Sequence, residues 1–143
     1  MSFQPHWEEK VWGRAMHLFC SPHAAVSYLE MKSGYRCSRH RHAERVNFFA
    51  VHEGAVVIEE WHFFTGGEDP IRQDMALLCA GSTLTVYTGI WHRFRVLQDA
   101  RMTEIYWPRE NGIVLMSDIE RDDVGGPDDL VKLKAELFEL GLI

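Results

Sequence analysis

The sequence predicts an all-β fold, a small barrel or sandwich of short strands, followed by one helix near the C-terminal end. Apolar and polar residues alternate with a period of two in the segments 82–87, 92–97 and 101–107. Runs rich in Val, Phe and other aromatic residues add candidate strands at 24–31, 45–51, 54–61 and 75–79. Turn-forming residues separate these runs at spacings of about 8–12 residues, which is typical of antiparallel barrels and sandwiches. We therefore expect a barrel over about residues 14–107.

The last segment of the chain changes to a helical period. Four leucines recur there at spacings of three and four residues: Leu130, Leu133, Leu137 and Leu140. Pro127 suits a first helical turn, and the acidic residues that follow it favour the positive end of a helix dipole. The pattern predicts one amphipathic helix over about 127–140, whose apolar stripe packs on the barrel or on a second subunit.

Length, charge and cysteine content limit the class of protein. The chain of 143 residues suits a single domain over 1–143, and its 46% hydrophobic content excludes collagen-like and disordered chains. A formal net charge of −6 without a basic stripe argues against nucleic-acid binding. The longest apolar runs are too short to cross a bilayer, and the charged residues at 8–10 leave no visible secretory leader. The three cysteines lack C-x-x-C spacing, so we expect reduced thiols in a cytoplasmic protein.

The eight histidines are unevenly distributed along the chain. His40 and His42 are two residues apart, and side chains at i and i+2 of a strand point to the same face. Two neutral imidazoles side by side suit a divalent metal such as Zn, Mn, Fe or Ni.

The glycines around these histidines extend the pattern. Residues 34–54 read G-x5-H-x-H-x4-N-x6-G, and residues 81–92 read G-x5-Y-x-G-x2-H. Together they resemble the two motifs of the cupin superfamily, G-x5-H-x-H-x4-E-x6-G and G-x5-P-x-G-x2-H-x3-N. Every glycine and histidine of both motifs is matched: Gly34, His40, His42, Gly54, Gly81, Gly89 and His92. The resemblance implies a small antiparallel cupin barrel (a double-stranded β-helix or jelly roll) with a divalent metal inside, at three histidines.

Three positions depart from the cupin motifs. Asn47 stands in place of Glu, Tyr87 in place of Pro, and Val96 in place of Asn. Asn47, at the fourth ligand position, keeps an oxygen donor but removes a negative charge. The charge of a metal there would stay uncompensated, which lowers its affinity and makes a bound water more acidic. The alternative is that metal binding has been lost and Asn47 is a remnant.

Two further stretches resemble type II mannose-6-phosphate isomerases. E-K-V-W-G at 9–13 is similar to their E-K-P-W-G, and S-D-I-E-R-D-D at 117–123 is similar to their D-I-x-R-x-x-D. Their Q-x-H-x-H-R-x-E pattern is not kept, because Arg39 precedes the first motif histidine and Ala43 follows the second. The resemblance implies a carbohydrate isomerase and leaves the sugar open.

A carboxylate near the metal is predicted from strand register. If the turn at 53–54 joins 47–51 and 56–60 in a hairpin, Asn47 pairs with Glu60 on the inner face. Glu60 would then act as a ligand, as a partner of a ligand or as a general base. The alternatives are a one-residue slip, which places Glu59 there instead, and a solvated charge at the strand end. In the favoured register, Glu60→Gln is expected to weaken metal affinity or activity, whereas Glu59→Gln should change them little.

These observations favour a metal-dependent sugar or sugar-phosphate isomerase. Aldose–ketose isomerisation needs a metal to polarise a carbonyl and a base to move a proton between adjacent carbons. The three histidines (His40, His42 and His92) and Asn47 would hold the metal, and Glu60 or Glu44 would carry the proton. The alternatives are an Fe(II)-dependent oxygenase on the same histidines and a non-catalytic cupin that binds a small ligand.

Both faces of the predicted hairpin carry apolar residues. Val46, Phe48 and Ala50 lie opposite Asn47, and an isolated small barrel would leave such residues partly exposed. We therefore expect a homodimer built from edge strands or the N-terminal segment. Its other partner is a small-molecule substrate such as a sugar phosphate.

Overall fold

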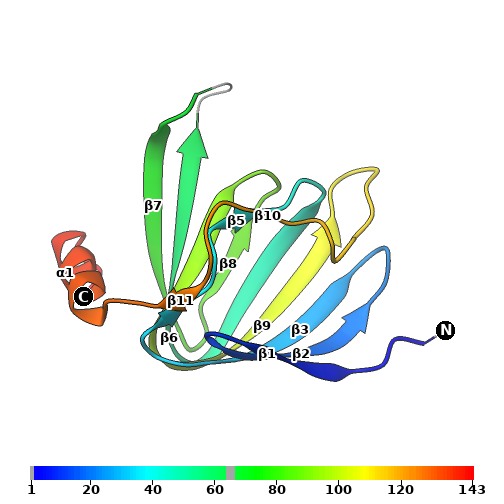
Figure 1. Cartoon of the computed structure of the whole chain (residues 1–143), viewed down its shortest axis with the longest axis horizontal. Coiled ribbons are helices and arrows are strands. Elements are labelled where there is room, and N and C mark those ends of the chain that lie inside the picture. The colour runs from blue at the N-terminus through cyan, green and yellow to red at the C-terminus, as the bar shows by residue number, and fades with distance from the viewer. Residues whose placement is uncertain (1, 64–66) are drawn as a thin grey trace.

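The computed structural model describes residues 2–63 and 67–143 (Figure 1). In these residues the chain forms one curled antiparallel sheet system and one helix, which confirms the predicted all-β jelly-roll class. The strands are β1 (His6–Lys10), β2 (Gly13–Cys20), β3 (Ala25–Met31), β4 (Tyr35–Arg36), β5 (His40–Arg41), β6 (Arg45–Phe63), β7 (Pro70–Cys79), β8 (Thr83–Val86), β9 (Trp91–Pro108), β10 (Glu120–Arg121) and β11 (Gly126–Pro127). The helix is α1 (Leu130–Glu139).

Two long strands, β6 and β9, organise the sheet. They pair with each other from Arg45 opposite Pro108 to Trp61 opposite Trp91. The first half of β6 also pairs with β8, and its second half pairs with β7. The second half of β9 pairs with β3, which continues to β2 and β1, while its first half pairs with β4 and β5. Each long strand thus contributes one half to each of two layers, as in a jelly roll.

Both long strands bend at the same place. The register between them is irregular from Val51 to Val56, and Gly54 has a φ of 82°. A Cβ at Gly54 would lie 2.0 Å from the backbone oxygen of Asp99, so only glycine permits this close approach. The predicted turns at 53–54 and 98–99 are therefore bends within continuous strands, since pairing resumes beyond them.

This bend makes the predicted hairpin wrong. β6 continues past the bend instead of reversing, so its two halves lie in different layers. Asn47 pairs with Val86 and Tyr106, and Glu60 pairs with His92. Glu60 still shares a face with a motif histidine, but through a neighbouring strand and not through a hairpin.

The space between the layers holds the main apolar core. Four apolar residues of β6 are in it, two on each side of the bend: Phe49, Val51, Val56 and Ile58. Val96 and Met102 of β9, both fully buried, pack in the same cluster. Alternating apolar positions therefore point inward along both long strands, as the period-2 pattern predicts.

Helix α1 covers the outer face of the layer that contains β7 (Figure 1). Leu133 and Leu137 are fully buried and pack against Val57 of β6. The apolar outer face of this half of β6 is thus covered by the chain's own helix. Of the two predicted positions for the apolar stripe of the helix, the barrel is the one observed.

The helix begins later than predicted. It covers 130–139 and not 127–140, because Pro127 is extended and pairs with Tyr35 in the sheet. Asp129 is the N-cap, and its side chain accepts a hydrogen bond from the backbone N–H of Lys132. An aspartate at this position satisfies one of the backbone donors that a helix start leaves unpaired.

A buried ion-pair network joins α1 to the sheet. Arg95 of β9 donates to both carboxylate oxygens of Asp128, at 2.6 and 2.9 Å. Its Nη1 also lies 2.8 Å from Glu59 and 2.8 Å from Glu136 of the helix. Burial lowers the pKa of Arg95, but hydrogen bonds with the three carboxylates outweigh burial and raise the pKa above its ordinary value. Glu59 is 1% exposed and also pairs with Arg93, so it belongs to this network. The small effect of Glu59→Gln on metal affinity or activity stays a prediction.

Cys20, Cys37 and Cys79 are all free thiols. No helix in the described part of the chain is long and apolar enough to cross a membrane.

Candidate metal centre

Three histidines from β5, the loop after it and β9 converge on one another. His40 pairs directly with His92 across the two strands, and His42 follows one residue after β5. One ring nitrogen of each lies within 4.8 Å of the others. The ring centroids are separated by 4.5 to 5.5 Å. The structure therefore brings the three histidines into a group that could hold a metal ion.

Each imidazole is oriented by a backbone carbonyl. A carbonyl can only accept a hydrogen bond, so each Nδ1 carries the ring proton and each Nε2 keeps a free lone pair. Metal-binding histidines are commonly held in this way by a second partner. The three contacts are His40 with Ser38 (2.8 Å), His42 with Asp118 (2.6 Å) and His92 with Ile90 (2.8 Å).

The surroundings keep the three rings neutral. Burial, together with repulsion from neighbouring histidines and Arg45, lowers the pKa of each to about 3. The Nε2 atom of His42 is buried and has no hydrogen-bond partner. A divalent cation would satisfy that lone pair, and a set of three neutral imidazoles is a donor set that such ions accept.

Asn47 lies beside the histidines, at the predicted fourth position. Its side chain is fully buried, and its Nδ2 is 3.5 Å from Nε2 of His92. Its Oδ1 is buried without a hydrogen-bond partner. The two ends of an amide exchange places on a half-turn of the side chain. Asn47 can therefore donate to His92 or direct its oxygen toward the group.

A cavity of about 620 Å³ lies beside the histidines, and two of the three imidazoles line it. Glu104 and Tyr106 of β9 also line it, with His17 of β2 and Ser27 of β3. His17 pairs with Ser27, and Ser27 pairs with Glu104, so these side chains share one face of the first layer. The cavity thus combines a group able to hold a metal with a row of proton-carrying side chains.

Comparison with known proteins shows the fold. No protein-family model and no curated protein matches the sequence. Oxalate decarboxylase from Bacillus subtilis has a TM-score of 0.67 and 14% identity, with 100% of this chain and 36% of that chain covered. KdgF from Halomonas sp. has a TM-score of 0.59 and 16% identity, with 74% of this chain and 90% of KdgF covered. The capsular polysaccharide assembling protein CapF from Staphylococcus aureus has a TM-score of 0.64 and 19% identity, with 86% of this chain and 35% of CapF covered.

These three are cupin-fold proteins. The chain has the cupin fold. It spans about a third of the length of oxalate decarboxylase and CapF and most of the length of KdgF. Because the identities are all below 20%, the likeness establishes the architecture and leaves the activity open.

Glu104 and Tyr106 form a hydrogen-bonded pair inside this cupin barrel. The Tyr106 hydroxyl donates to the Glu104 carboxylate. Burial raises the pKa of both groups, and for Tyr106 the nearby Glu104 raises it further. The period-2 alternation of residues 101–107 puts Glu104 on the same strand face as Met102 and Tyr106, which both point inward. This pattern in the sequence could have identified Glu104 as a cavity residue.

Glu60, predicted as the missing carboxylate, contacts a different histidine. Its Oε2 lies 3.3 Å from Nε2 of His62, which is also 3.3 Å from Asp74 of β7. These three residues form a second group whose ligand atoms lie within 4.8 Å of one another. Burial raises the pKa of Glu60, while His62 opposes this. Glu60 is not among the described residues that line the cavity of the cupin barrel.

Glu44, the other predicted proton carrier, lies at the surface of the cupin. Its carboxylate is 2.5 and 3.0 Å from the guanidinium of Arg109. It is also outside the set of described residues that line the cavity.

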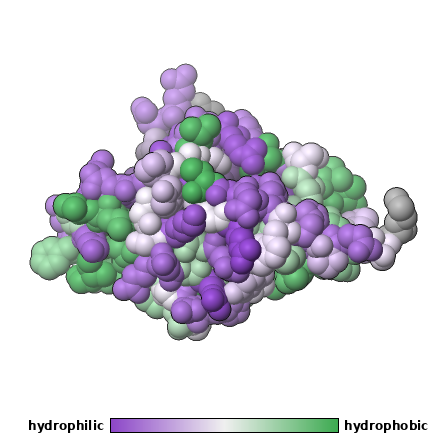
Figure 2. All heavy atoms as spheres, turned by 60° about the horizontal axis from the view of Figure 1, so that its bottom comes forward, coloured by the Kyte–Doolittle hydropathy of each residue, from purple (hydrophilic) through white to green (hydrophobic). Residues whose placement is uncertain are grey.

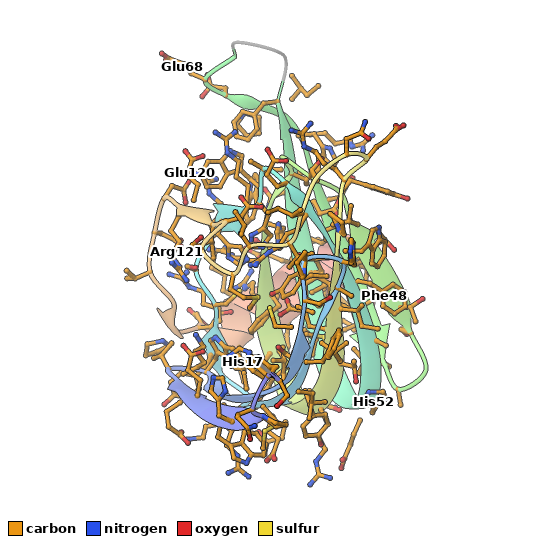
Figure 3. The ribbon with its side chains drawn as sticks, turned by 90° about the vertical axis from the view of Figure 1, so that its right-hand side faces the viewer. His17, Phe48, His52, Glu68, Glu120 and Arg121 are labelled. Carbon is orange, nitrogen blue, oxygen red and sulfur yellow. The ribbon has the colours of Figure 1, made fainter. Side chains whose placement is uncertain are left out.

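One side of the cupin cavity is charged. Figure 3 shows His17 on β2 and Arg121 on β10, both cavity-lining, on the opposite side of the molecule from Phe48 and His52 of β6. The Nε2 atom of His17 is 2.6 Å from Glu8, and its Nδ1 is 2.9 Å from the hydroxyl of Ser27. The sequence patterns gave no reason to place His17 in a cavity.

Proposed function

We propose that the protein is a metal-dependent cupin isomerase that acts on a sugar or sugar phosphate. The observation that carries the proposal is the Glu104–Tyr106 pair in the same cavity as the histidine group. A divalent ion at the histidines, when bound, would polarise a substrate carbonyl as a Lewis acid. The fold likeness to a capsular polysaccharide assembling protein agrees with a carbohydrate substrate.

Within this proposal, Glu104 moves the proton between adjacent carbons of the substrate. Burial raises its pKa, which makes its carboxylate a stronger base than that of a solvent-exposed glutamate. The hydrogen bond from Tyr106 fixes the orientation of the carboxylate toward the cavity. Glu60 and Glu44 have partners outside the cavity, so the geometry favours Glu104 over both.

The change Glu104→Gln tests the proposal. We expect it to lower kcat by about 100- to 10,000-fold, the range that general acid–base groups supply, without changing the metal content. The assay is exchange of solvent deuterium into the carbon next to the carbonyl, followed by NMR on a panel of aldoses, ketoses and their phosphates. Glu44→Gln is the matched control and should retain activity. Exchange at the wild-type rate in Glu104→Gln, or no exchange with any sugar in the wild type, would contradict the proposal.

A second candidate function rests on the donor set. Three neutral histidines with the neutral Asn47 also suit Fe(II), with positions left open for oxygen. Elemental analysis of protein purified without chelators or a nickel column separates the two functions. Zinc or manganese supports the isomerase, whereas iron together with oxygen uptake supports an oxygenase.

We also propose a homodimer, on the basis of exposed apolar surface. Figure 2 shows hydrophobic atoms gathered at the end of the visible face where α1 lies, and others toward the N-terminal end. Val131 and Phe138 of α1 are exposed, as are Leu18 and Phe19 of the second strand, β2. Such surface favours association through β1 and β2. We expect sedimentation at micromolar concentration to give twice the chain mass of 16.6 kDa, and a monomer mass would count against the dimer.

A further inference from the structure

Arg45, the first residue of β6, is a buried cation in the wall of the cavity. It is 3% exposed and lines the cavity together with two of the metal-site histidines. Its guanidinium lies over the ring of Tyr106, 4.0 Å from the centroid. Its Nη1 donates to the backbone oxygen of Leu115 at 3.0 Å and lies 3.6 Å from the sulfur of Met116. Packing on both sides thus fixes the plane of the guanidinium.

No ion pair compensates this charge, although the Glu104 carboxylate lines the same cavity and interacts with it electrostatically at longer range. Among the described residues, no acidic group forms an ion pair with Arg45 within 4.0 Å, whereas most other arginines of the chain have such a partner. Its Nε is buried and has no hydrogen-bond partner. Leaving a buried charged donor unsatisfied is costly, and arginine keeps its charge under all ordinary conditions.

The unsatisfied donor defines the free edge of the guanidinium. The described contacts of Arg45 use Nη1, so Nε and Nη2 have no partner among the described residues. Nε is fully covered, so a ligand reaches it when neighbouring side chains move. Nε and Nη2 form the fork of parallel N–H donors that binds both oxygens of a carboxylate.

The metal group itself brings no negative charge to the cavity. Its members are the three histidines and the neighbouring Asn47, which replaces the carboxylate that a cupin motif carries at that position. A divalent ion at the histidines would raise the positive charge beside Arg45 still further. An anionic ligand would compensate the guanidinium alone or both charges together.

We propose that this cavity selects substrates that carry a carboxylate, which the Nε and Nη2 atoms of Arg45 bind. The carbohydrate character of the substrate rests on the proposed isomerase function, whereas its carboxylate rests on Arg45 alone. A planar, singly charged carboxylate matches one free edge of one arginine. A phosphate group carries up to two charges and a third terminal oxygen. The other lysine and arginine among the described cavity-lining residues, Lys10 and Arg121, are not buried.

The experiment is a binding titration with the metal removed, so that binding through a metal cannot contribute. The protein is treated with a chelator, dialysed and titrated calorimetrically with three matched probes: D-glucuronate, D-glucose and D-glucose 6-phosphate. The same series with D-galacturonate, D-galactose and D-galactose 6-phosphate covers the other common sugar stereochemistry. We expect the sugar acid to bind at least about tenfold more tightly than its neutral and phosphorylated counterparts in one series or both. The Arg45 Nε–H resonance in a nitrogen–proton NMR spectrum should shift on addition of the acid.

Variants test whether Arg45 is responsible. Arg45→Gln should weaken binding of the sugar acid by about tenfold or more, and Arg45→Lys should restore it only in part, because lysine lacks the fork. Arg109→Gln, an exposed arginine outside the cavity, should bind the acid as the wild type does. The NMR shift in the wild type tests the contact even if Arg45→Gln fails to fold.

Three outcomes would overturn the inference. They are equal binding of neutral sugars and sugar acids, tighter binding of the phosphates, and wild-type binding of the acid by folded Arg45→Gln. Because no metal and no turnover enter the titration, its result stays separate from failure of the isomerase proposal.

Discussion

Replacing His92 with Ala is expected to lower the affinity for a divalent metal by more than about 100-fold. Loss of a hydrogen-bonding partner behind a ligand already costs roughly 10- to 100-fold, and His92 would be a ligand itself. The ring is 2% exposed, so the variant leaves an enclosed space next to two remaining imidazoles. The measurement is elemental analysis of protein purified without chelators, followed by competition with a chelator of known affinity for zinc.

The second histidine group provides the matched control. Glu60, His62 and Asp74 could also hold an ion, so bound metal alone does not locate the site. His62→Ala removes the only imidazole of that group and should leave the tight ion in place. Tight, stoichiometric metal in His92→Ala combined with its loss in His62→Ala would move the centre to the second group.

The grouping of the three histidines was predictable from the sequence, in part from local geometry and in part from motif spacing. His40 and His42 are two residues apart in extended backbone, and this spacing alone orients both rings the same way. His92 and Asn47 were placed by motif spacing, and the structure brings both beside the pair. The inward positions of β6 were also predictable, because alternation is preserved on each side of the bend.

The position of Glu60 depended on a long-range property that the sequence does not display. A glycine at a positive φ occurs in reversing hairpins and also in sharp bends of continuous strands. Which of the two forms depends on the partner strand, and here Asp99 of β9 lies against Gly54. The partners of Glu59 could not be predicted for the same reason, because both arginines that pair with it lie on a strand about 35 residues later in the chain.

The last prediction concerns Arg95, which holds the C-terminal segment on the sheet. Arg95→Met should lower the free energy of unfolding by about 3–5 kcal/mol, because it leaves buried carboxylates without their counter-ion. Methionine keeps most of the aliphatic volume, so the expected loss is chiefly electrostatic. With a total stability of about 5–15 kcal/mol for a domain, this is a large fraction. Urea unfolding measures the change, and proteolysis within α1 should become faster.

The pH dependence of this loss separates electrostatics from packing. In the wild type, burial raises the pKa of Asp128 but Arg95 outweighs it and holds the pKa below its ordinary value. The stability that Asp128 contributes is therefore present above its unfolded pKa of about 3.9 and is lost as the pH falls through the lowered folded value. Without Arg95, burial dominates and Asp128 takes up a proton more readily in the folded state.

The difference between wild type and Arg95→Met should therefore be largest near pH 7 and shrink toward pH 4. Arg101→Met is the matched control, because Arg101 pairs with Glu53 at 3.5 Å on an exposed surface where both side chains are more than half accessible. That variant should change stability by no more than about 1 kcal/mol. A loss in Arg95→Met that is the same at pH 4 and pH 7 would show that packing, and not the ion-pair network, attaches α1 to the barrel.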